Sequence, residues 1–139
     1  MTSVFLSSNI DAKMTKRIRS VQNDLNIIKA LEELPRNIED KKHNLTVCLD
    51  NNTTRSNETR FEHIAKKYHE LKVRDIKRIP HGITHYVKFS KSKDHDETYY
   101  YFIKRGGKDR GFIQVAIKIY NDDHTKAYVK TIYITYRIY

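Results

Sequence analysis

The spacing of apolar residues changes once along this chain, and that change constrains the fold more than any other feature. Over 10–31 and again over 61–71, apolar side chains recur at intervals of three and four, which is the repeat of an amphipathic helix. From Ile83 onward they alternate with polar side chains at an interval of two, the repeat of a half-buried strand. We therefore expect an α+β domain in which helices come first and a sheet comes last.

The second half of the chain predicts a meander of short strands. We expect these strands at about 84–90, 98–105, 112–120 and 126–138. The links at 106–111 and 121–124 are short and rich in Gly, Asn and Asp, which is hairpin chemistry. Links this short join only antiparallel neighbours. The fold class predicted is thus α+β, with N-terminal helices packed on a C-terminal antiparallel β-sheet of about four strands.

The first half predicts a long helix, a short strand and a loop. The apolar stripe of the helix stops at Pro35 and consists of Ile10, Met14, Ile18, Val21, Leu25, Ile28 and Leu31. Such a stripe can bind a partner or a second copy, but we favour packing on the chain's own sheet. The apolar run at 45–49 is a candidate strand, and the polar stretch at 50–57 is a loop that serves as a lid or a linker.

A second helix is predicted to begin with the capping box Thr59-x-x-Glu62. Over 60–71, its buried face consists of Phe61, Ile64, Tyr68 and Leu71. His63, Lys67 and Glu70 share another face at i, i+4 and i+7. Residues 73–79 predict one more short helix, ended by the Pro80-His81-Gly82 sequence.

Length, charge and cysteine content narrow the class of protein. A chain of 139 residues suits a single domain, which we divide into a helical region with its loop (1–57) and a core (58–139). No apolar run is long enough to span a membrane, and the opening residues lack the basic segment of a secretory signal. The single Cys48 excludes an internal disulfide and a Cys-rich zinc module. We expect a cytoplasmic protein with no membrane partner.

The positive charge is concentrated in the second half. The net charge is +10, of which residues 1–60 contribute +2 (10 basic, 8 acidic) and residues 61–139 contribute +8 (17 basic, 9 acidic). All 10 Tyr and 4 of the 5 Phe also lie in the second segment. An excess of cations favours an anionic partner, most often nucleic acid, and aromatic side chains can stack on its bases.

Three clusters in the second half are candidate sites. His81, His85 and the 95–97 segment share no helix face, so the spacing does not predict a metal site, and we expect no metal or cofactor. The Gly-rich 106–111 segment is not followed by a helix and is therefore a turn rather than a phosphate loop. The cations around that turn are candidates for contact with a nucleic-acid backbone: Lys104, Arg105, Lys108 and Arg110.

Two further clusters contain side chains that could bind a phosphate or transfer a proton. Along the last strand, the face opposite the isoleucines shows Thr131, Tyr133, Thr135 and Arg137, a row of hydroxyls ending in a guanidinium that suits a phosphate. On the second helix, His63 lies one turn from Lys67. A proton-transferring histidine beside a cation is the smallest set of groups that can cleave RNA without a metal.

Residues 58–139 resemble the phage-associated branch of the barnase–EndoU–colicin–RelE-like (BECR) nucleases. The similarity rests on three short segments in order: a helix with E-H-I-x-x-[KR] (Glu62 to Lys67), an apolar and basic strand (FIQVAIKIY, 112–120) and a closing strand of the form V-x-T-x-Y (Val129 to Tyr133). The family pattern has a histidine directly after the basic helix residue, where this chain has Tyr68 and then His69.

The resemblance implies a metal-independent endoribonuclease that uses the RNA 2′-hydroxyl as nucleophile. It implies His63 as the acid/base residue, Lys67 as the electrostatic stabiliser, and Thr131 and Tyr133 as phosphate-binding residues. His69 and Arg137 are secondary candidates from the residue pattern alone. The expected partners are RNA, with tRNA among the candidate substrates, and a protein inhibitor or antitoxin if the chain is a toxin or phage-linked effector.

Two alternatives stay open at this point: a domain of this kind without catalysis, and an interaction protein whose main surface is the first helix. The same domain can bind nucleic acid or inhibit a partner without catalysis, and Tyr68 at the position of the family histidine is compatible with that. The geometry also sets a condition. If the helix packs on the apolar face of the sheet, Thr131 and Tyr133 point away from it, so a shared site requires His63 to lie near a sheet edge or at a helix end.

Overall fold

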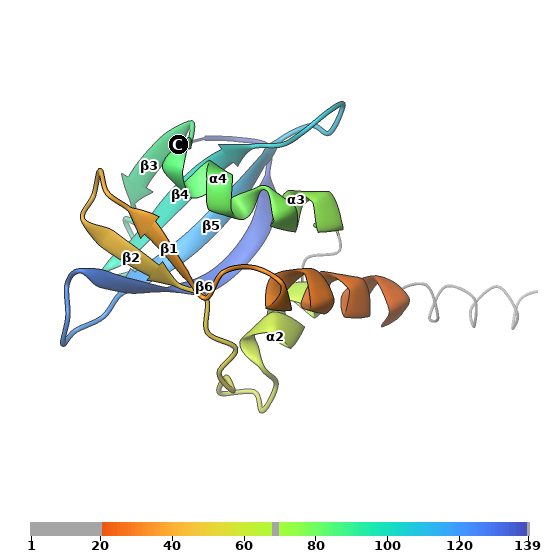
Figure 1. Ribbon diagram of the computed structural model, residues 1–139, viewed down its shortest axis with the longest axis horizontal. Helices are drawn as coiled ribbons and strands as arrows, with labels where there is room; N and C mark the ends of the chain where they lie inside the picture. The colour runs from red at the N-terminus through yellow and green to blue at the C-terminus, as the bar shows by residue number, and fades with distance from the viewer. Residues whose placement is uncertain (1–20, 68–69, 139) are drawn as a thin grey trace, which may run out of the picture.

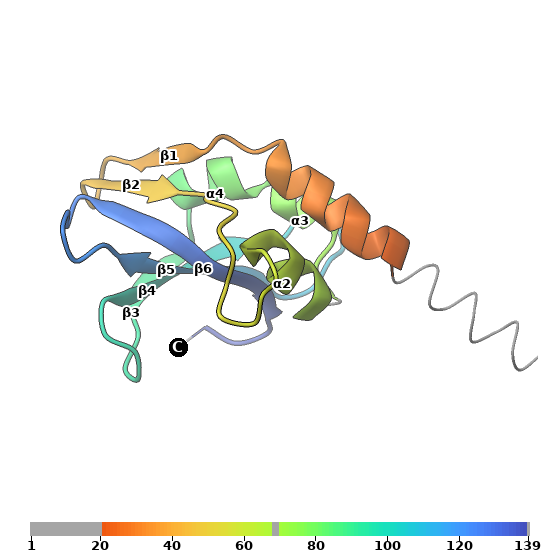
Figure 2. The same ribbon diagram turned by 90° about the horizontal axis from the view of Figure 1, so that it is seen from below.

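The computed structural model describes residues 21–67 and 70–138, and in this part of the chain six strands form one curled sheet with helices on one side of it (Figures 1 and 2). Residues 21–32 are helical. The remaining elements, in chain order, are β1 (Asn37–Asp40), β2 (Leu45–Cys48), α2 (Arg60–Lys67), α3 (Val73–Lys77), α4 (Ile79–Thr84), β3 (Lys88–Lys91), β4 (Thr98–Lys104), β5 (Phe112–Ile119) and β6 (Lys126–Thr135).

The α+β class and the antiparallel meander β3–β4–β5–β6 are confirmed, but the sheet is larger than expected. Its strand order is β1-β2-β6-β5-β4-β3, and β2 pairs with β6 in parallel. The β1–β2 hairpin thus adds two strands to the expected four: β2 is the candidate strand at 45–49, whereas β1 was not expected. Only Ile38 is apolar in the four residues of β1, so the alternation there was too weak to indicate a strand.

The prediction of a strand over 84–90 was wrong at its start. Residues Ile79–Thr84 form α4, and β3 begins only at Lys88. Pro80 does not end a helix but lies in the first turn of one, where its missing N–H and fixed φ cost nothing. The last strand also ends at Thr135 rather than at 138.

The capping box at the start of α2 is present. The Glu62 backbone N–H donates to Thr59 Oγ1 at 3.2 Å, and the Thr59 N–H donates to Glu62 Oε1 at 3.3 Å. Asn51 adds a third contact, because its side-chain oxygen accepts the Phe61 N–H at 2.9 Å. These bonds satisfy donors that a helix N-terminus leaves unpaired, and they fix where α2 begins.

Only the later part of the predicted N-terminal stripe can be placed, because Ile10, Met14 and Ile18 lie outside the described residues. Leu31 is fully buried and Ile28 packs against the core. Val21 and Leu25, by contrast, are 57% and 54% exposed. The described helix therefore packs on the domain through its second half, from Ile27 onward, and not through its first residues.

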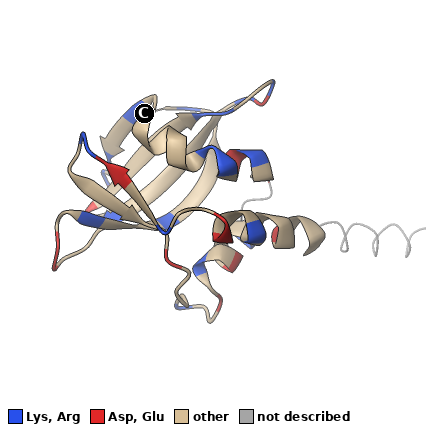
Figure 3. Ribbon diagram, viewed as in Figure 1, with Lys and Arg blue, Asp and Glu red and all other residues tan. Residues whose placement is uncertain are grey.

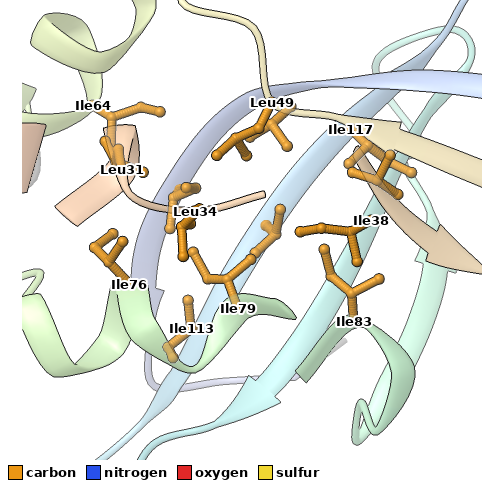
Figure 4. Packing of buried hydrophobic residues seen from close by; sticks show 14 of the residues in the cluster. Leu31, Leu34, Ile38, Leu49, Ile64, Ile76, Ile79, Ile83, Ile113 and Ile117 are labelled. Carbon is orange, nitrogen blue, oxygen red and sulfur yellow. The ribbon is translucent and has the colours of Figure 1, made fainter. Parts of the chain in front are cut away.

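The hydrophobic core fills the space between the helices and one face of the sheet (Figure 4). Ile76, Ile79 and Ile83 from α3 and α4 meet alternate residues of β4 and β5, such as Ile113. No helix of the described residues is long and apolar enough to cross a bilayer. The opposite face of the sheet carries the side chains that form the candidate functional site described below.

The helix α2 occupies the open edge of β6. Strand β2 pairs with β6 only from Lys126 to Tyr128, and beyond this point α2 lies beside β6 (Figure 2). Arg60 donates from Nη1 to the Lys130 carbonyl at 2.8 Å, a bond that a neighbouring strand would otherwise provide. Because α2 buries Phe61, Ile64 and Ala65, its other side is free to face the polar surface of the sheet.

Candidate functional site

The polar face of the sheet is built from rows of residues that pair across three strands. One row runs Tyr100–Ala116–Thr131 from β4 through β5 to β6, and the next runs Phe102–Gln114–Tyr133. Side chains on one strand alternate between faces, so both rows point away from the core. Ala116 lies in the middle of its row, and its small side chain leaves a hollow between its two larger neighbours.

A β-bulge adds a cation to this face. Ala116 pairs with Thr131 while Ile117 pairs with Val129, which leaves Lys130 without a partner on β5. The extra residue shifts the alternation, so Lys130 and Thr131 are both half-buried on the polar side while Val129 and Ile132 are buried in the core.

These features form a cavity of about 350 Å³, which we call the edge pocket. It is lined by Arg60, His63, Lys67, His95, Thr98, Tyr100, Ala116, Lys130, Thr131 and Tyr133. The four residues predicted as catalytic, His63, Lys67, Thr131 and Tyr133, thus line one cavity. The condition for a shared site is met, because α2 lies at the open edge of β6 and not across the apolar face.

The edge pocket is strongly cationic. Arg60, His63, Lys67, His95 and Lys130 bring five nitrogen-bearing side chains to it, and no Asp or Glu is among the described residues of its lining. Burial lowers the pKa of Lys130, and the positive charges of Lys118 and Arg60 lower it further. A bound anion would relieve this repulsion, so the arrangement favours an anionic group such as a phosphate.

His63 is oriented by a carboxylate that the sequence pattern did not single out. Its Nδ1 lies 2.9 Å from Glu58 Oε1, so Nδ1–H donates to the carboxylate and Nε2 is the nitrogen left for a ligand. This hydrogen bond lowers the pKa of Glu58 below its ordinary value near 4.5, and the charges of His63 and Lys66 act in the same direction. Glu58 therefore stays ionised at neutral pH.

The loop before α2 holds Glu58 in place. The Thr54 N–H and hydroxyl donate to the Glu58 carbonyl at 2.7 and 3.0 Å, and Thr53 pairs with Thr59 in an isolated bridge. The segment expected to be a lid or linker is thus a turn closed on itself, with a carboxylate at its end.

One hydroxyl in the edge pocket has no hydrogen bond to satisfy it. Thr131 Oγ1 is buried and lacks a partner among the described residues. Leaving a buried polar atom unpaired costs about 1–3 kcal/mol, so such atoms in folded proteins call for an explanation. A ligand oxygen bound in the pocket would accept a hydrogen bond from this hydroxyl.

The other predicted residues lie elsewhere. His69 is outside the described residues, and Arg137 is exposed beyond the end of β6 and does not line the pocket. The rings of His81 and His85 stack with their centroids 4.0 Å apart. His95, by contrast, does line the edge pocket. Lys104, Lys108 and Arg110 are exposed around the β4–β5 turn, at one end of the polar face.

Arg105 does not belong with these exposed cations, and its grouping with them must be corrected. It is 6% exposed, and its Nη2 lies 2.9 Å from Asp75 Oδ2 while its Nε donates to Asp75 Oδ1 at 3.0 Å. Arg105 Nη1 also donates to the Arg110 carbonyl. Its guanidinium is therefore fully engaged inside the protein, against Asp75 of α3, a helix on which Figure 3 shows both basic and acidic residues.

Sequence reasoning missed several residues that line or support the edge pocket. Arg60, at three residues before His63, falls on the same helix face, so the i, i+3, i+7 spacing of Arg60, His63 and Lys67 could have included it. Strict alternation placed Lys130 with Ile132 on the apolar side, and nothing in the local sequence signals the bulge. Glu58 precedes the helix and carries no spacing signal.

Comparison of the chain with protein-family models, with curated proteins and with solved structures found no match. The resemblance to the BECR nucleases therefore remains an expectation from the sequence.

Proposed function

We propose that this protein is a metal-independent endoribonuclease whose active site is the edge pocket. The observation that carries the proposal is the placement of His63, held by Glu58 through Nδ1, at a pocket that also receives Arg60, Lys67 and Lys130. A histidine with one nitrogen fixed by a carboxylate and the other facing a cationic cavity is a suitable general base beside a phosphate.

Cleavage would proceed by attack of the 2′-hydroxyl oxygen on the adjacent phosphorus. His63 Nε2 accepts the hydroxyl proton, and the bond from phosphorus to the 5′ oxygen of the next nucleotide breaks. Lys67, Arg60 and Lys130 stabilise the extra negative charge on the phosphorane, with the Thr131 hydroxyl as a hydrogen-bond donor to it. The products are a 2′,3′-cyclic phosphate and a 5′-hydroxyl.

The departing 5′ oxygen needs a proton, and His95 is the pocket residue best suited to supply it. It comes from the β3–β4 loop and lines the pocket with Thr98 of β4, the strand that pairs with β5 on the side away from β6. A proton donor and a proton acceptor on opposite sides of the phosphate suit an in-line displacement. Tyr133, also in the lining, would contact the phosphate or the ribose.

The test is incubation of purified protein with total RNA and with tRNA. We expect wild type to cut RNA and His63→Ala to lose the activity by at least about a hundredfold, because general acid/base catalysis typically contributes that much. His81→Ala is the matched control, since His81 is exposed and lies outside the pocket. Intact RNA with folded wild-type protein, or equal cleavage by His63→Ala, contradicts the proposal.

The biological setting proposed is that of a toxin or phage-linked effector held in check by a protein inhibitor or antitoxin. Expression of the wild-type chain should then inhibit growth, and His63→Ala should not.

A second candidate is a nucleic-acid-binding or inhibitory protein without catalysis. It is favoured by the exposed cations Lys104, Lys108 and Arg110, which lie away from the edge pocket. Under this alternative, changing all three to Glu abolishes binding, whereas His63→Ala has little effect. The steep salt dependence expected of several phosphate contacts applies to both candidates.

A further inference from the structure

A second cavity of about 460 Å³ adjoins the edge pocket on the polar face of the sheet. It is lined by Ser90, Lys91, Ser92, Lys93, Asp94, Tyr100, Gln114 and Tyr133. Tyr100 and Tyr133 line both cavities, so the two form neighbouring parts of one groove. The edge pocket is cationic, whereas this adjoining cavity combines two aromatic rings, an amide and hydroxyls with charged residues of both signs.

Gln114 is the unusual residue of the adjoining cavity. It is 1% exposed, near the middle of β5, and its Oε1 is buried without a hydrogen-bond partner among the described residues. Its neighbours across the sheet are Phe102 and Tyr133. A folded chain rarely leaves a buried amide oxygen unpaired, and an apolar residue would pack there as well. The amide therefore indicates a ligand that supplies a donor.

Two tyrosines beside Gln114, Tyr100 and Tyr133, offer rings on which a flat group could stack. The Tyr100 hydroxyl donates to Ser92 Oγ at 3.2 Å, which ties its ring to the segment after β3. Rings of Tyr beside a groove are the platforms on which single-stranded nucleic acids stack their bases. Exposed Lys93 also lines this cavity, next to Asp94, and could meet a further phosphate. The ammonium of Lys91 lies over the Tyr99 ring instead.

The spacing between the residue rows of the two cavities is close to the length of one nucleotide. Gln114 and Ala116 are successive residues on the same face of β5, so their rows are about 6.6 Å apart. If the phosphate of a nucleotide lay above Ala116, the base of the same nucleotide would therefore lie near Gln114.

We propose that the adjoining cavity is a nucleobase subsite, in which Gln114 selects a base that carries an exocyclic amino group. The inference rests on the proposed function, since it assigns the edge pocket to the phosphate of the same nucleotide. Oε1 accepts a hydrogen bond from the amino group, and the amide nitrogen can donate to a neighbouring ring nitrogen. Adenine and cytosine each offer both atoms on one edge and are the preferred bases, whereas uracil has no amino group and binds weakest.

The test measures binding of adenosine and uridine monophosphates, as 3′ and 5′ isomers, and of inorganic phosphate. We expect wild type to bind an adenosine isomer at least about tenfold tighter than its uridine counterpart. Gln114→Leu, which keeps a similar volume, should reduce adenosine affinity to the uridine level and leave phosphate affinity unchanged. Gln22→Leu, on the exposed side of the N-terminal helix, is the control and should change nothing.

Equal binding of the two bases by wild type overturns the inference, and it does so without reliance on any variant. A preference that survives in Gln114→Leu overturns it as well. These outcomes are separate from the fate of the proposed function. If RNA cleavage depends on His63 but shows no preference for the base, the nucleobase subsite is rejected and the proposed ribonuclease is not. A Gln114-dependent base preference with intact RNA supports the subsite and rejects the ribonuclease.

Discussion

At the scale of single residues, the pair formed by His63 and Glu58 decides what the edge pocket can do. The carboxylate engages Nδ1 at 2.9 Å and so selects the nitrogen that meets a ligand. His63 and Lys67 could be identified from the sequence because they share a helix face. Glu58 could not, because its contact depends on how the preceding turn folds back, through bonds to Thr54.

Replacement of this carboxylate should impair turnover more than binding. In Glu58→Gln the amide is neutral and no longer stabilises a proton on His63, so we expect kcat for a short RNA to fall about a hundredfold. KM should stay within about twofold, since Glu58 does not line the edge pocket. Steady-state kinetics measure both, and Glu58→Asp should recover part of kcat. An unchanged kcat in Glu58→Gln contradicts the positioning role.

The small side chain of Ala116 is a second determinant at this scale. Because Ala116 lines the edge pocket between Tyr100 and Thr131, Ala116→Leu should fill the hollow and abolish phosphate binding and RNA cleavage. The side chain points away from the core, so the unfolding temperature should change by only a few degrees. Ala116→Ser adds a single small atom and should retain activity. Full activity in Ala116→Leu would place the substrate elsewhere.

At the scale of elements, the site depends on a helix at a sheet edge and a bulge in the strand beside it. The sequence predicted α2, its capping box and the hydroxyl row of β6, since each follows from a local pattern. It did not predict that β2 pairs with β6 in parallel and stops at Tyr128, because pairing between distant segments leaves no local signal. That early stop opens the edge that α2 occupies.

The ion pair between α3 and the segment after β4 is structural, and its loss should destabilise the fold. Arg105→Ala leaves Asp75, which is fully buried, without its partner, and we expect the free energy of unfolding to fall by about 3–5 kcal/mol. Lys104→Ala, at the exposed neighbouring position, should change it by less than about 0.5 kcal/mol. Denaturant titration measures both. A stable Arg105→Ala protein with weakened RNA binding would restore Arg105 as a contact residue.

At the scale of the whole molecule, the two faces of the sheet have different roles. One face and the helices enclose the core, and the other holds the edge pocket and the adjoining cavity. The concentration of charge and tyrosine in residues 61–139 was visible in the sequence, and the polar face draws most of its residues from that segment. Which cations face the pocket was not visible, since Lys130 enters through a bulge and Arg105 turns inward.

The most direct test of the central claim is the chemistry of the ends that the protein leaves on RNA. A defined oligoribonucleotide is incubated with wild type and with His63→Ala in the presence of a metal chelator, and the new ends are mapped. We predict 2′,3′-cyclic phosphate and 5′-hydroxyl ends from wild type, no cleavage by His63→Ala, and no cleavage at a position whose 2′-hydroxyl is replaced by hydrogen. Ends with a 3′-hydroxyl and a 5′-phosphate, or RNA left intact by wild type, would contradict it.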